Sequence, residues 1–249
     1  MVANLDALKF FKFGCLFPTT FHTSLLVSTL GPIATSAAIG VVCLGIGAVK
    51  ERRGKKEEKA KLVDFCTSLF LTLTYLVFAS VSTTIFKTFQ CERYGDDPTR
   101  YLVEDQQIDC DSDAHRLMEA YALFMMFVYP FGITMLYTVL LVRKRKSLVQ
   151  DNRQDNVSLV KMGFLWEMYQ PRVWWFEIFE CVRRLAMTGL LVFVSPGSVT
   201  QVNVGILNSL ISVIMYSQLM PFEDYSDDKL AVVSQWSIFA TLFGALLVR

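Results

Sequence analysis

The sequence predicts an all-α membrane protein whose helices cross the bilayer several times. Hydrophobic residues make up 53% of its 249 residues, and the mean hydropathy is positive. They gather in blocks of about 20 residues or more, the length that a helix needs to cross a hydrocarbon layer of about 30 Å. Charged residues lie almost wholly between these blocks. We therefore expect a polytopic transmembrane helical bundle that forms a single domain over residues 1–249.

About six apolar blocks mark the expected spans, at 24–49, 62–86, 117–142, 178–195, 200–220 and 229–248. The first residues, 1–14, lack the basic segment, apolar core and small-residue cleavage site of a signal peptide. They resemble an interfacial segment or the cut edge of a longer chain, and the sequence ends just as abruptly. We therefore expect a fragment of a longer membrane domain.

The linkers between the blocks predict the orientation in the membrane. Two of them, 50–61 and 143–172, each contain seven Lys and Arg residues. The linker at 87–115 instead contains three basic and eight acidic residues. Because basic linkers are retained in the cytosol, we expect the acidic loop on the other side. Six spans then leave both termini outside the cytosol, in the plasma membrane or an endomembrane.

Two of the six cysteines, Cys91 and Cys110, flank the acidic loop. Since the loop is expected in an oxidising compartment, the sequence predicts a disulfide between them that closes the hairpin. Cys15 is an alternative partner, or remains free. The other cysteines lie in apolar spans and are expected to be small, buried and unreactive: Cys43, Cys66 and Cys181.

The carboxylates of the acidic loop raise the question of a cation site. The segment 109–113, Asp-Cys-Asp-Ser-Asp, faintly resembles a calcium loop. It lacks the spaced oxygen ligands, the turn glycine and the distal glutamate of an EF-hand. We therefore expect no metal site, and we interpret the loop as a solvated acidic surface that raises the local concentration of cations.

The fourth block carries charges in its first half, although the rest is apolar. Glu180 precedes Arg183 and Arg184 by three and four residues, so the three side chains share one helix face. One hypothesis is a helix end anchored at the cytosolic surface, whose charges pair within their own helix. The other is a charge network between helices, with Glu177 and Glu167 as further members, which couples the helices during gating. We favour the first.

Polar residues recur at helical spacing in the last two blocks, so that they lie on one face of each helix. Such faces usually let membrane helices pack closely and exchange hydrogen bonds, which is the interpretation that we favour. The alternative is a polar path between the two helices, which Asn208 favours because an amide inside the membrane needs partners. The residues concerned are Gln201, Asn208, Ser212, Ser234, Ser237 and Thr241.

The third block contains Pro130 and Gly132 near its middle. Proline removes a backbone donor and clashes with the preceding turn, so the sequence predicts a kink here. The kink is either static or a hinge used in gating.

Three stretches resemble one family of membrane proteins. They are YPFGITMLYTVLLVRKRK (129–146), WEMYQPRVWWFEIFECVRRLAMTGLLVFVSPGSVTQ (166–201) and MPFEDYSDDKLAVVSQWSIFATLF (220–243). With the paired cysteines of the acidic loop, they resemble the TRP C-terminal domain proteins of protists and algae, which are loosely related to the fungal TRP-like and flavin-carrier group. The resemblance covers most of residues 5–245. It implies a helical transmembrane domain with a cation-channel role.

Two departures from that family bear on the implied role. The link between the last two blocks is short and lies on the cytosolic side, so it supplies no pore loop with a selectivity signature. Family members also have further helices beyond both ends. A channel would therefore need flanking helices or assembly into a homo-oligomer.

The sequence contains no nucleophile–base pair, metal-ligand cluster, phosphate loop or cofactor fingerprint, so we expect no enzyme and no cofactor. A net charge of +1 predicts no general attraction to nucleic acid. The first functional hypothesis is a TRP-like cation channel or transport domain in the lipid bilayer. The alternative is a non-conducting anchor or receptor module that relays the binding of an ectodomain to the basic linkers. In that case, anionic lipids or partners would bind at 50–61 and 143–146.

Overall fold

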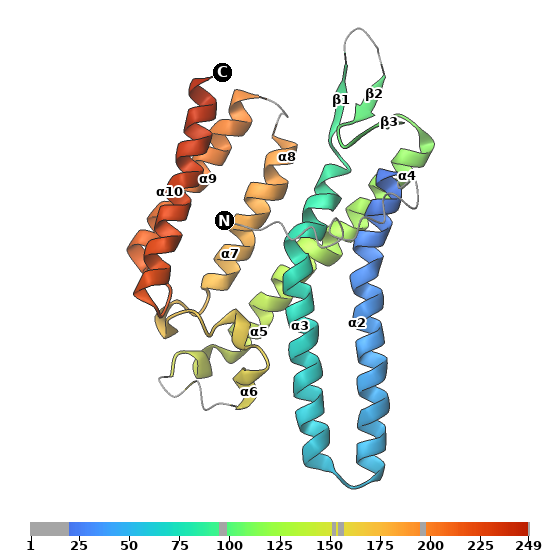
Figure 1. The fold of residues 1–249 in the computed structure, drawn as a ribbon, viewed down its shortest axis with the longest axis vertical. Helices are drawn as coiled ribbons and strands as arrows, with labels where there is room; N and C mark the ends of the chain where they lie inside the picture. The colour runs from blue at the N-terminus through green and yellow to red at the C-terminus, as the bar shows by residue number, and fades with distance from the viewer. Residues whose placement is uncertain (1–19, 95–98, 151–152, 154–156, 195–197, 249) are drawn as a thin grey trace.

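The structure is a computed structural model that describes residues 20–94, 99–150, 153, 157–194 and 198–248. The described part is a bundle of α-helices with a small β-sheet at one end (Figure 1). Five of the described helices are long and apolar enough to cross a membrane, as expected of a membrane-embedded helical bundle.

The first two described helices form a long antiparallel hairpin, α2 (Phe21–Arg52) and α3 (Lys56–Lys87). The turn between them contains Gly54 at a φ of 73°, a left-handed conformation that glycine adopts without strain. Each helix has 32 residues, which is about 48 Å at a rise of 1.5 Å per residue. The closed end of the hairpin therefore projects beyond the other helices (Figure 1), and it carries the basic linker 50–61.

Among the described residues, two pairs of cysteines are at bonding distance, and Cys15, the alternative partner considered from the sequence, lies outside the described residues. The pair Cys91–Cys110 closes the acidic loop, as predicted. The pair Cys43–Cys66 joins α2 to α3 near the closed end of the hairpin, so the expectation that these two cysteines are unreactive is wrong. They lie at nearly equal distances along the chain from the turn at Gly54, which brings them to the same level of the hairpin.

The acidic loop contains a β-sheet that the all-α prediction missed. Its three strands are antiparallel and follow one another in space as they do in the chain: β1 (Cys91–Arg93), β2 (Arg100–Leu102) and β3 (Asp105–Asp109). These strands are too short and too polar to show the alternation by which a half-buried strand is recognised.

The segment 109–113 forms a tight turn and a helix start. The Asp109 carboxylate accepts a hydrogen bond from the Asp111 backbone N–H, and the Ser112 hydroxyl accepts one from the His115 backbone N–H. Ser112 therefore caps the next helix. A hydrogen bond from Arg100 lowers the pKa of the Asp111 carboxyl.

The third long helix is continuous but changes its winding in the middle. It consists of α4 (Asp113–Met126), the π-helical segment η2 (Phe127–Ile133) and α5 (Thr134–Leu148). Pro130 and Gly132 both lie in η2, so the irregularity falls where the sequence predicts a kink. A Cβ atom on Gly132 would lie 2.9 Å from the carbonyl oxygen of Phe127, so this wide turn requires glycine.

The charged fourth block differs from the prediction of six spans. After a linker of short helical turns, α7 (Phe176–Leu185), the π-helical segment η6 (Ala186–Leu190) and α8 (Leu191–Phe193) run in sequence. This segment runs beside the long helices (Figure 1). Because of its four charged residues, it is not one of the five helices that are apolar enough to cross a membrane. The linker turns are α6 (Val157–Val160), η4 (Gly163–Leu165) and η5 (Pro171–Val173).

The last two helices are α9 (Val199–Leu219) and α10 (Tyr225–Leu247), which pack against each other as an antiparallel pair. α9 ends at Met220, whose φ of 42° is left-handed, and Pro221 follows it. The end of α10 and the start of α2 lie at the same end of the bundle as the sheet (Figure 1). The described parts of the two basic linkers lie at the opposite end (Figure 1).

The close packing of α3 against η6 gives a prediction about stability. A Cβ atom on Gly189 would lie 2.0 Å from the ring of Phe86, whereas one on Gly244 would meet nothing within 4 Å. We expect Gly189→Ala to lower the free energy of unfolding by about 1–3 kcal/mol, the usual cost of overpacking. Gly244→Ala, the matched control, should be neutral or slightly stabilising. Thermal unfolding in detergent measures both, and equal effects would contradict the packing described.

Candidate functional site

Four charged residues lie on one short helix, and two of them are almost inaccessible. Glu177 is 0% exposed and Glu180 is 3% exposed, on α7. Arg183 and Arg184 follow one turn later on the same face. Burying ionised groups is costly unless they are paired. The partners of these four side chains therefore determine whether α7 is stable in this buried position.

The charges first pair within their own helix. Glu180 accepts two hydrogen bonds from Arg183, from Nε at 2.8 Å and from Nη2 at 2.9 Å, which is the strong forked geometry of arginine and carboxylate. Arg184 bridges both carboxylates, at 3.4 Å from Glu180 and 3.9 Å from Glu177. The four formal charges therefore cancel within a single helix.

Three tyrosines from other parts of the fold complete the network. Tyr216 of α9 donates a hydrogen bond to Glu180, and Tyr169 of the linker donates one to Glu177 at 2.7 Å. Arg184 donates to the hydroxyl of Tyr75 on α3 at 3.1 Å, and its guanidinium lies 5.2 Å from the centre of that ring. The network thus has both features considered from the sequence: pairing within α7 and contacts between helices.

Glu167, the further member considered from the sequence, lies apart from the network. It is exposed on the linker and, among the described residues, forms no ion pair with the four charged side chains. Tyr216 and Tyr75 were missed because nothing local in a sequence indicates which aromatic residue will meet a charged side chain 36 or 109 residues away. Tyr169 is only eight residues from Glu177, but a linker of short turns lies between them and no helical spacing pairs the two.

An open hollow of about 600 Å³, mostly apolar but with several polar side chains in its lining, lies where α7 faces α10. Arg183 lines it from α7, and Ser234, Ser237 and Thr241 line it from α10. Each of these three hydroxyls donates to a backbone carbonyl four residues earlier in its own helix. The polar face of α10 is therefore turned toward the hollow, and Ser237 and Thr241 are exposed there.

The polar residues of α9, unlike those of α10, do not line this hollow. Gln201 donates to the carbonyl of Leu191 at 2.8 Å, and the Ser212 hydroxyl donates to the carbonyl of Asn208 at 2.7 Å. The Asn208 side-chain nitrogen Nδ2 is buried and, within the described residues, donates no hydrogen bond. A buried donor without a partner costs about 1–3 kcal/mol, so Asn208 stands out among the predicted polar residues.

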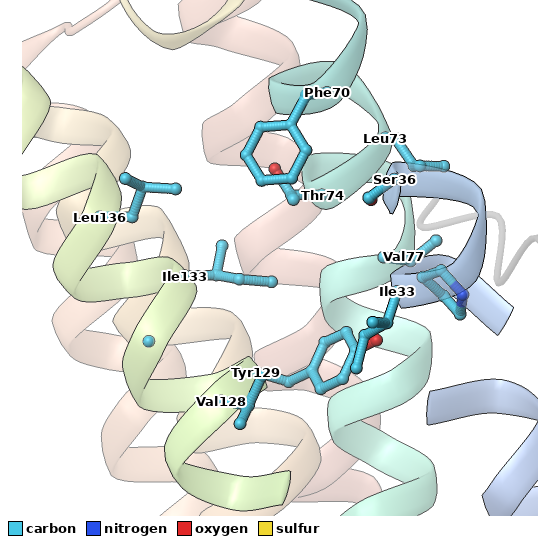
Figure 2. Close-up of a pocket in the computed structure, with 12 residues that line it drawn as sticks. Ile33, Ser36, Phe70, Leu73, Thr74, Val77, Val128, Tyr129, Ile133 and Leu136 are labelled. Carbon is cyan, nitrogen blue, oxygen red and sulfur yellow. The ribbon is translucent and has the colours of Figure 1, made fainter. Parts of the chain in front are cut away.

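An apolar pocket of about 380 Å³ lies where α2, α3 and the π-helical segment η2 meet. Figure 2 shows Ile33, Val77 and Ile133 among the side chains around it. Tyr129 and Thr74 add hydroxyl groups to the lining, and these groups are already engaged: Tyr129 donates to the Thr29 carbonyl, and Thr74 exchanges a hydrogen bond with Tyr137. The predicted hinge, Pro130 and Gly132, is thus next to a cavity that suits an apolar ligand.

No protein-family model, curated protein or solved structure matches this chain. The resemblance to the TRP C-terminal domain proteins therefore stays a prediction. The function has to be inferred from the arrangement of the chain's own side chains.

The contact between Tyr216 and Glu180 gives a second prediction. A hydrogen bond to a charged group contributes about 1.5–3 kcal/mol, and Tyr216→Phe removes only the hydroxyl that donates it. We expect this variant to lose stability in that range, measured by denaturant titration in detergent micelles. Tyr225→Phe removes an exposed hydroxyl at the start of α10 and serves as the control. Equal losses in the two variants would show that Tyr216 does not support the buried carboxylate.

Proposed function

We propose that this chain is the membrane-embedded domain of a TRP-like ion channel or transporter, in which α7 couples the movements of its neighbours. The observation that carries the proposal is the buried network of Glu177, Glu180, Arg183 and Arg184. Charged side chains inside a membrane domain are expensive and mark conduction, transport or gating sites by default. This network is neutral and contacts α3, α9 and the linker, which suits a coupling element.

The proposed path for the ion runs beside the network. The hollow between α7 and α10 offers three hydroxyl groups and Arg183 in a lining that is otherwise mostly apolar. On the adjacent helix α9, the side-chain amide nitrogen of Asn208 is buried and, within the described residues, donates no hydrogen bond. Acidic residues at the sheet end of the bundle would concentrate cations at the entrance, which favours cations over anions. Because α10 is mostly exposed along its length, a second copy of the chain could complete the wall of the path.

A second candidate is a non-conducting receptor or anchoring module. It is favoured by the projecting end of the α2–α3 hairpin, where basic side chains are exposed. Such a cluster would bind anionic lipid head groups, each Lys or Arg contributing about 1 kcal/mol near the surface. The exposed basic residues are Arg52, Arg53, Lys55, Lys56 and Lys61, whereas Lys50 and Lys59 are half-buried and pair with Glu58 and Glu51.

Cation flux from liposomes distinguishes the two candidates. The purified chain, alone and with its native flanking sequence, is reconstituted and the release of potassium is recorded beside that of chloride. A channel or transporter should release potassium, and Arg183→Ala and Asn208→Leu should each reduce the rate roughly tenfold or more, which corresponds to about 1.4 kcal/mol in activation free energy. Ser217→Ala, which removes an exposed hydroxyl from α9, is the matched control and should leave the rate unchanged.

Folding of each variant is checked by size-exclusion chromatography and by protection of the Cys91–Cys110 pair. Folded protein without flux in both forms would overturn the channel proposal and leave the receptor module. If Arg183→Ala and Ser217→Ala reduced the flux equally, the charge network would have no specific role in the mechanism.

A further inference from the structure

The only two histidines of the sequence lie together, beside the Cys91–Cys110 pair. His22 is in the first turn of α2 and His115 in the first turn of α4, far apart in the chain. Nε2 of His22 is 3.1 Å from Nδ1 of His115, and the two rings stack with their centres 5.4 Å apart. A structural disulfide needs no histidine, so this grouping calls for another explanation.

The sulfurs of Cys91 and Cys110 are bonded to each other, and one ring nitrogen of His115 lies beside them, so reduction of the disulfide would leave two thiols next to an imidazole. The three atoms are within 4.8 Å of one another, and Nε2 of His115 is 3.8 Å from Sγ of Cys91. Zinc binds thiolate at about 2.3 Å and imidazole at about 2.0–2.1 Å, so neighbouring ligands of a tetrahedral ion are about 3.3–3.8 Å apart. Nε2 of His115 and Sγ of Cys91 are already about that far apart, whereas the two sulfurs would have to move apart once the disulfide is broken.

His22 orients His115 as metal-bound histidines usually are oriented. The tautomer of His115 that binds a metal through Nε2 carries its proton on Nδ1, from which it can donate to Nε2 of His22. His115 is fully buried, which fixes its ring. Two carboxylates add negative charge nearby: Glu119, at 3.6 Å from Nε2 of His115, and Asp105, which accepts from the backbone N–H of Phe21.

We propose that Cys91, Cys110 and His115 form a zinc site that is available only when the Cys91–Cys110 disulfide is reduced. A dithiol reductant supplies two electrons and two protons, which convert the disulfide to two thiols while the dithiol becomes a disulfide itself. Zn²⁺ then displaces the two thiol protons and binds two thiolates and the imidazole, with water in the fourth position. The disulfide ties β1 to the turn before α4, and the metal would tie both to His115 of α4 as well.

The site is tested on the full chain carrying Cys43→Ser and Cys66→Ser, so that reduction frees no other pair. Cobalt(II) is the probe, because its bonds to thiolate produce an intense charge-transfer absorption. We expect the reduced protein to bind one equivalent, to release about two protons per ion and to lose the signal when Zn²⁺ is added. The oxidised protein should show no such signal.

Variants distinguish cobalt binding at this site from non-specific cobalt binding by cysteine thiols. His115→Gln should abolish tight binding, and His22→Gln should weaken it by about 10–100-fold, as loss of an orienting partner does. A chain with Cys91→Ser and Cys110→Ser that keeps Cys43 and Cys66 is the matched control, since reduction frees one pair of thiols in it as well, but with no histidine beside them. Equal signals from the reduced and oxidised protein would overturn the proposal, as would cobalt binding unchanged by His115→Gln or no binding by folded, reduced protein.

Discussion

The burial of Glu180 is the constraint on which the placement of the surrounding helices depends. A carboxylate that is 3% exposed cannot stay ionised without strong partners, and Arg183 supplies the first of them from its own helix. The two arginines also need hydrogen-bond acceptors, and the hydroxyl of Tyr75 on α3 accepts a hydrogen bond from Arg184. With Tyr216 of α9 on the other side, the positions of three helices are set by the hydrogen bonds of one charged cluster.

The linker that precedes α7 is also held in place by hydrogen bonds. Its backbone pairs with the α9–α10 connection through Gln170 to Pro221 at 2.8 Å and Glu223 to Met168 at 3.0 Å. These bonds hold the ring of Tyr169 between Phe176 and Phe222, and its hydroxyl against Glu177. An aromatic cluster therefore excludes water from one end of the charge network, which strengthens the electrostatic interactions inside it.

The elements that could be predicted from the sequence are those whose signal is local. The apolar blocks predicted the long helices, and Pro130 with Gly132 predicted the irregular turn, because both features depend on a short run of residues. Cys91 and Cys110 could be paired because they flank one loop. The Cys43–Cys66 pair, Tyr216 as a partner of Glu180 and the meeting of His22 with His115 depend on which helices become neighbours, and no short stretch of sequence specifies that.

α3 connects the apolar pocket to the charge network. Both π-helical segments, η2 and η6, pack against it, and π-helical turns commonly mark functional positions in helices. Thr74 lines the pocket and hydrogen-bonds to Tyr137, while the next residue, Tyr75, contacts Arg184. A ligand in the pocket can bias the network only if it binds one position of α3 better than another. Thr74 and Tyr75 are neighbours on α3, so any shift of this part of the helix would move the pocket lining and the partner of Arg184 together.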